Sequence, residues 1–149
     1  MMFAQSMSNL PRALLAITLL MPIAAAPEGA PIEVAVSGVR QAQGRVHVDI
    51  CSEKLFLTSD CLYVAEAPAQ VGTTIVTVRN VPPGRYAAQA FHDRNGNGKV
   101  DMLFGIPREA VGFSNDAPVP MRAPHFDDAA FEHGSTPQRI AFTLHHILG

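Results

Sequence analysis

One stretch of the chain shows a turn, a strand and a polar loop in succession: residues 81–101 read VPPGRYAAQAFHDRNGNGKVD. The Pro-Pro-Gly at 82–84 cannot lie inside a sheet, because proline lacks the N–H that a central strand donates. Residues 85–92 are predicted to form a strand that delivers the chain into the polar loop, which begins at Asp93. A β protein is therefore the first expectation.

Other strands are predicted on both sides of this stretch. Apolar residues alternate with polar ones at 32–36 and 46–50, which is the period of a half-buried strand, and Gln43-Gly44 separates the two as a hairpin turn. Further strands are expected at 61–66, 73–78 and 140–144, and a short helical turn within 124–131. The sequence thus predicts an all-β fold, an antiparallel immunoglobulin-like or prealbumin-like sandwich of about seven strands with one long ordered loop.

The alternation also predicts which side chains are buried. His47, with Arg45 and Asp49, is expected on the outer face of its strand. The residues expected to be mostly buried are Ile32, Val34, Val36, Val46, Val48, Ile50, Ile75 and Phe142.

Residues 1–26 have the pattern of a secretory signal peptide. Arg12 precedes an apolar run at 13–26 that ends in small residues and is too short to span a membrane. Cleavage near 24–26 would leave a single domain at 27–149, with Met1, Met2 or Met7 as the start. We expect a periplasmic or secreted protein whose mature chain has no membrane span.

The charge excludes one class of partner. The formal net charge is −2, and removal of a leader with one Arg and no acid makes it −3. Because no basic patch accompanies this charge, nucleic acid is not an expected partner.

Cys51 and Cys61 are the two cysteines of the chain. In an exported protein such a pair usually closes, here around a nine-residue loop, which would stabilise the fold by roughly 2–3 kcal/mol. A metal-binding or catalytic thiol pair is the alternative. It is less favoured because the spacing is not Cys-x-x-Cys and no His lies close by.

The polar loop resembles a calcium-binding loop. Its oxygen-bearing side chains stand at alternating positions, Gly98 follows the third of them, and Lys99 would offer its carbonyl. This spacing suits a hard cation, which needs six to eight oxygens from a tightly curled chain. The proposed ligands from the loop are Asp93, Asn95, Asn97, Lys99 and Asp101.

The loop is incomplete, because position twelve is Phe104 where a bidentate Glu is required. The closing ligand must come from the long segment 101–134, which has no clear strand and is therefore expected to be functional. Glu109 is one candidate, and Asn115 and Asp116 are the others. The alternative is a cation-free turn, since Asn-Gly is a strong hairpin signal and occurs twice here.

Several motifs, in order, are similar to one bacterial family. They are Val81-Pro82-Pro83-Gly84-Arg85-Tyr86-Ala87, Ala90-Phe91-His92-Asp93 with the Asn-Gly repeats, Gly105-Ile106-Pro107, and Gly112-Phe113-Ser114-Asn115. They resemble the bacterial domain-of-unknown-function family 2141 over nearly the whole mature chain. The resemblance implies an exported β-sandwich protein of bacteria and implies no established activity. Met102-Leu103 departs from it, where a more polar pair is expected.

No nucleophile, zinc or phosphate-loop motif occurs. His92, immediately before Asp93, could act as a base beside a cation, although a His at a strand end more often bonds a loop carbonyl. Two hypotheses remain. The first is a non-enzymatic exported module with a calcium-held loop and an envelope ligand, such as a glycan or a protein. The second is a divalent-cation-dependent hydrolase with His92 or Glu109 as base.

Overall fold

The computed structural model describes residues 21–22, 25, 28–119 and 122–149. The predicted signal peptide, 1–26, lies almost wholly outside them. Within these ranges no helix is long and apolar enough to cross a membrane.

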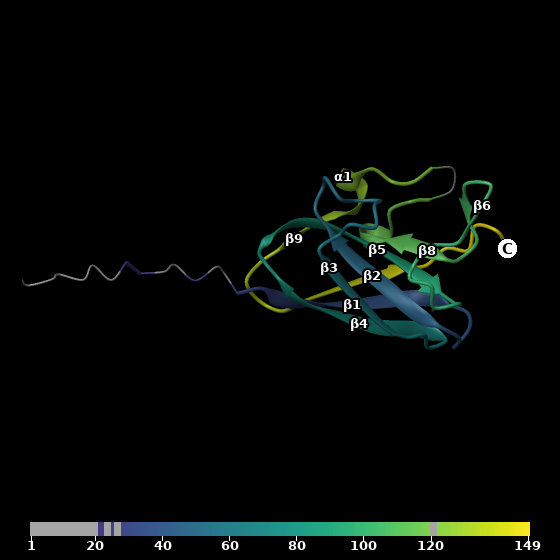
Figure 1. Cartoon of the computed structure of the whole chain (residues 1–149), viewed down its shortest axis with the longest axis horizontal. Helices are drawn as coiled ribbons and strands as arrows, with labels where there is room; N and C mark the ends of the chain where they lie inside the picture. The colour runs from purple at the N-terminus through teal and green to yellow at the C-terminus, as the bar shows by residue number, and fades with distance from the viewer. Residues whose placement is uncertain (1–20, 23–24, 26–27, 120–121) are drawn as a thin grey trace, which may run out of the picture.

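Two β-sheets face each other in two layers (Figure 1). The three-stranded sheet has the order β10-β1-β4, and the five-stranded sheet has the order β3-β2-β5-β8, with β9 also pairing β5. The strands of the first are β1 (Ala30–Val39), β4 (Gly72–Val81) and β10 (Gln138–Thr143). Those of the second are β2 (Arg45–Cys51), β3 (Tyr63–Pro68), β5 (Gly84–Asp93), β8 (Val111–Phe113) and β9 (Ala130–His133).

The predicted all-β sandwich is confirmed, with one difference in strand direction. Every pairing is antiparallel except that of β1 with β10, which is parallel and places Val34 opposite Ile140. The six strands predicted from the sequence all form, and each lies within a few residues of its predicted range.

The core lies between the sheets and consists mainly of valine and isoleucine from β1, β2 and β4. Seven of the eight residues predicted to be buried have at most 2% of their surface exposed, and Phe142 is the largest of them. The prediction for Ile75 is wrong, since it is 41% exposed. On β4 the inward side chains are Thr74, Val76 and Val78. Thr74 can be buried because its hydroxyl bonds the backbone of Gln70.

The long segment 101–134 contains more regular structure than its sequence suggested. It forms β8 and β9, a two-stranded hairpin of β6 (Met102–Leu103) and β7 (Ile106–Pro107), a 3-10 turn η1 (Ser114–Asp116), and the predicted helical turn α1 (Phe126–Ala129). These strands have two to four residues each, too few to show a period of two.

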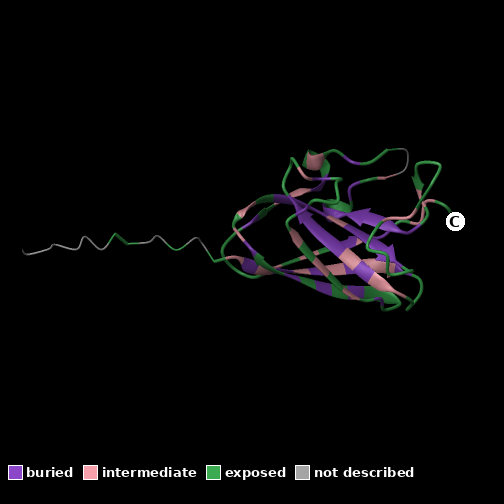
Figure 2. Cartoon of the chain, in the orientation of Figure 1, coloured by how far each residue is buried: buried purple, intermediate pink, exposed green. Residues whose placement is uncertain are grey.

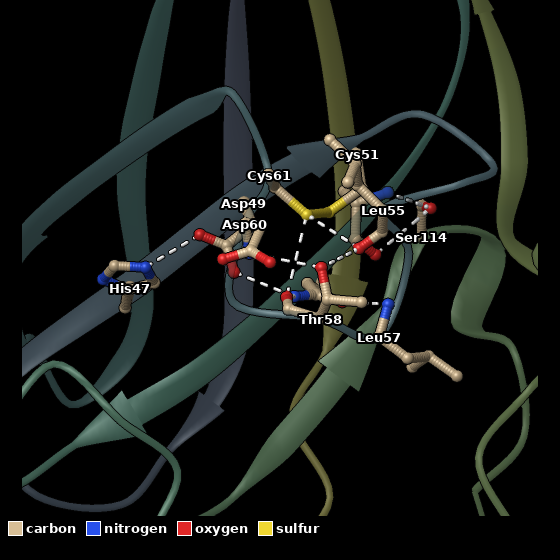
Figure 3. The surroundings of a disulfide bond; sticks show 11 residues. His47, Asp49, Cys51, Leu55, Leu57, Thr58, Asp60, Cys61 and Ser114 are labelled. Atoms are coloured by element: carbon tan, nitrogen blue, oxygen red, sulfur yellow. Dashed lines mark hydrogen bonds and ion pairs between the residues drawn. A yellow bond between two sulfur atoms is a disulfide. The ribbon is translucent and has the colours of Figure 1, made fainter.

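The Cys51–Cys61 disulfide predicted from the sequence is present, with an S–S distance of 2.05 Å and a Cα–Cα distance of 4.9 Å (Figure 3). It joins the end of β2 to the chain just before β3. The loop between them, residues 52–60, is thereby held beside the outer face of the five-stranded sheet. Its residue Leu57 donates its backbone N–H to the side chain of Gln89 on β5, at 2.9 Å.

Candidate functional site

The polar loop, residues 93–101, curls around the carboxylate of Asp93. That side chain is buried and accepts the backbone N–H groups of Asn97, at 3.2 Å, and Gly98, at 2.8 Å. The amides of Asn95 and Asn97 donate to Asp101 at 2.7 and 2.8 Å. Gly98, like Gly96, has a positive φ, which a glycine adopts without strain.

Glu109 closes the loop from outside it. Its buried carboxylate accepts the backbone N–H of Arg94 at 3.0 Å and that of Asp101 at 3.2 Å, so one side chain links the two ends of the loop. Burial raises the pKa of Glu109. The two backbone N–H groups oppose that change, and the charges of Asp101 and Asp93 reinforce it.

The other two candidates for the closing ligand bond elsewhere. Asn115 donates its side-chain amide to the carbonyl of Ala130, at 2.8 Å, and Asp116 accepts the backbone N–H of Thr143, also at 2.8 Å. Both therefore tie η1 to the neighbouring strands β9 and β10. Of the three candidates, only Glu109 bonds to the polar loop.

The oxygen chemistry of this loop fits a hard cation. Carboxylates, amides and a carbonyl are ligands that calcium prefers over softer metals. Among the described residues, no group of three or more His, Cys, Asp or Glu side chains is arranged to hold a metal ion. Each carboxylate oxygen that accepts an N–H group still has a lone pair that is able to bind a cation.

His92 has the structural surroundings that strand-end histidines usually have. The residue is 2% exposed, and Nε2 lies 2.7 Å from the carbonyl oxygen of Gln43 in the β1–β2 turn. Its backbone N–H donates to the carbonyl of Ala110 at 3.0 Å. The side chain thus connects the turn at 43–44 to the start of the polar loop.

A groove of about 810 Å³ lies on the outer face of the five-stranded sheet. Its floor is formed by β2 and β5, and its walls by the 52–60 loop, the β6–β7 hairpin and residues 119 and 122–123. Lys99 of the polar loop also lines it. Figure 2 shows that the hairpin is exposed, and Phe104 at its tip is 94% exposed.

The polar side chains of the groove floor bond one another. Asp49 and Gln89 are cross-strand partners, and the amide of Gln89 donates to Asp49 Oδ2 and to the carbonyl of Thr58, each at 2.9 Å. His47 Nε2 lies 2.8 Å from Asp49 Oδ1, a contact drawn in Figure 3. The centroid of the His47 ring lies 4.8 Å from that of Phe91, and the two ring planes are tilted by 32°. The hydrogen bond to Asp49 raises the pKa of His47, despite the opposing effect of burial.

The strand pattern predicts the outward direction of His47, but it does not predict this groove. A signal was present, because His47 and Asp49 stand two residues apart and so share one face of a strand. What covers that face could not be derived, since the 52–60 loop and the hairpin are brought there by tertiary contacts.

Comparison with known proteins gives a family and no activity. No curated protein and no solved structure matches the chain. The model of a family described as an uncharacterised protein conserved in bacteria, domain of unknown function 2141, matches residues 34–141, well over half of the chain. The protein therefore belongs to the bacterial domain-of-unknown-function family 2141.

Proposed function

We propose that the protein is an exported binding module in which a calcium ion in the polar loop fixes one wall of the groove, and that the groove takes a ligand of the cell envelope. The ion would be held by Asp93, Asn95, Asn97, Asp101 and the Lys99 carbonyl, with Glu109 as the closing carboxylate. Export rests on the leader pattern at 1–26 and on the disulfide, which oxidising compartments favour.

One observation carries this proposal. The polar loop runs directly into the β6–β7 hairpin, and Glu109, two residues beyond that hairpin, bonds back to both ends of the loop. The two sides of the hairpin are therefore connected to β5 through the loop and Glu109, and the backbone N–H of Arg108 donates to the carbonyl of Asp101 at 2.8 Å. An ion that draws the loop together would hold the hairpin in place against the groove.

The hydrolase hypothesis receives less support from the geometry. His92 and Glu109, the two residues suggested as its base, are each 2% exposed and each bonded to backbone groups. A general base must reach the proton it removes, and neither of these side chains lines the groove.

Calcium should raise the melting temperature of the protein, because an ion that binds only the folded state stabilises it by mass action. For a dissociation constant on the order of 10⁻⁴ to 10⁻³ M, about 5 mM calcium adds about 1–2 kcal/mol. Scanning fluorimetry with calcium and then with a chelator measures this. Magnesium, which keeps its waters, should have a smaller effect.

Two variants make the test specific. Asp93→Asn keeps one oxygen, which can accept the N–H group of Gly98, but loses the second oxygen and the charge, so it should abolish the calcium response. Asp127→Asn, on the exposed helical turn α1, should respond like the parent. If the parent melts at the same temperature with calcium as with the chelator, the loop is a turn that binds no ion.

A further inference from the structure

The groove lining is mainly apolar, and the polar side chains of its floor already make hydrogen bonds. Leu57, Val64, Phe91, Met102 and Ile106 are among the side chains that line it. In the floor, the Asp49, Gln89 and His47 side chains bond one another or the 52–60 loop. A volume of about 810 Å³ lies within the range of sites that enclose small molecules.

This chemistry disfavours a glycan as the occupant. Each sugar hydroxyl that leaves water needs a hydrogen-bond partner, and an unpaired buried hydroxyl costs free energy. The floor offers few donors or acceptors that are not already bonded. An apolar body, in contrast, gains free energy from covering the side chains of the β6–β7 hairpin.

The charges that line the groove favour an anion. Lys99 and Arg122 are both exposed there, and no Asp or Glu pairs with either within the described part of the chain. The one acid of the lining is Asp49, and His47 lies against it. Two cations are therefore left without a counter-ion, in a protein whose formal net charge is −2.

We propose that the groove binds a small amphipathic carboxylate, with its apolar body between the β6–β7 hairpin and the sheet and its carboxylate at Lys99 and Arg122. This names the ligand class for the binding module proposed above, and it rests on that proposal only in needing the hairpin as a wall. The carboxylate would make charge-assisted hydrogen bonds with the two cations.

A dansyl-labelled undecanoate and its methyl ester test this with the whole protein. Dansyl fluorescence rises on transfer from water to an apolar site, so a titration gives both dissociation constants. The acid should bind at least about fivefold more tightly than the ester, since only the acid can pair with the cations. Equal binding of the two, or no binding of either, would overturn the proposal.

Substitutions then test where the carboxylate of the probe binds. Lys99→Glu and Arg122→Glu should each weaken binding of the acid about fivefold and leave the ester unchanged. Arg79→Glu, an exposed position on β4 of the other sheet, is the matched control and should change neither. If Arg79→Glu weakens the acid as much as Lys99→Glu does, the effect is one of overall charge and the proposed carboxylate position is wrong.

The apolar part of the site can be tested with two isoleucines of equal exposure. Ile106 on β7 and Ile75 on β4 are each 41% exposed, but only Ile106 lines the groove. Ile106→Ser should weaken both probes about tenfold, whereas Ile75→Ser should weaken neither. Equal effects of the two substitutions would show that the probe binds elsewhere.

Running each titration with calcium and with a chelator separates the two proposals. Tight binding that is the same in both conditions would support the ligand class and contradict the calcium-held wall. A calcium-dependent melting temperature without any probe binding would support the calcium-held wall and contradict the ligand class.

Discussion

His47 and Asp49 face the groove from neighbouring outward positions of β2, and their contact is the most polar feature of its floor. The folded state binds the imidazole proton more tightly than the unfolded chain does, since the pKa of His47 is raised. The contribution of the pair to stability is therefore complete below about pH 6.5, the ordinary pKa of His. It is lost as the pH rises through the raised pKa of the folded state.

Asp49→Asn should lower the pKa of His47, because it removes the charged partner whose hydrogen bond is the largest cause of the shift. The pKa is measured from the imidazole signals in an NMR titration of the folded protein. Asp60→Asn, an exposed acid in the adjacent 52–60 loop, is the control and should leave the midpoint where it is in the parent. An unchanged midpoint in Asp49→Asn would mean that the His47–Asp49 contact is absent in solution.

At the scale of elements, the β6–β7 hairpin has an unusual turn. Phe104 and Gly105 are its two central residues, and both have a positive φ, of 51° and 78°. Such a turn is normally Asn-Gly, because a bulky side chain is strained in the left-handed region. Phe104 recovers nothing from packing, since it is 94% exposed.

Phe104→Asn should therefore stabilise the protein, by roughly 1 kcal/mol, which is about 4 °C in melting temperature for a domain of this size. Thermal unfolding followed by circular dichroism measures it. Phe104→Leu keeps a bulky apolar side chain at the positive φ, and therefore keeps the strain, so it should melt like the parent. A rise in Phe104→Leu as large as that in Phe104→Asn would point to loss of the aromatic ring as the cause, in place of relief of strain.

Elements were predictable from the sequence where a period extends over five or more residues. The alternation in β1 and β2 predicted both the strands and their buried faces correctly. In β4 every residue from 73 to 78 is β-branched, so the pattern gave the strand but not its face, and Ile75 was misplaced. The candidate site followed the same rule: the proposed loop ligands came from local spacing and Glu109 from the polar residues of the segment 101–134, whereas the groove depends on segments that meet only in the folded chain.

For the whole molecule, stability depends on both sheets contributing to one core. Phe142 of β10 is 2% exposed and belongs to the same cluster as Val48 of β2, in the other sheet. Phe142→Ala should therefore destabilise the protein by about 3–5 kcal/mol, through lost burial and the cavity it leaves.

Denaturant unfolding of this variant gives the free energy. Ile75→Ala, which shortens an outward side chain, is the comparison and should cost less than about 1.5 kcal/mol. A loss in Ile75→Ala as large as that in Phe142→Ala would place Ile75 in the core, contrary to its 41% exposure.

The parallel pairing of β1 with β10 joins residues that are far apart in the sequence, such as Val36 and Phe142. A nascent chain can pair β1 with β4, but it cannot complete the core until the residues around 142 have left the ribosome. Contacts between such distant parts of a chain also form slowly. For a chain exported as proposed, this topology delays folding until the residues of β10 have been synthesised, so that a translocation channel that accepts only extended polypeptide would receive the domain still unfolded.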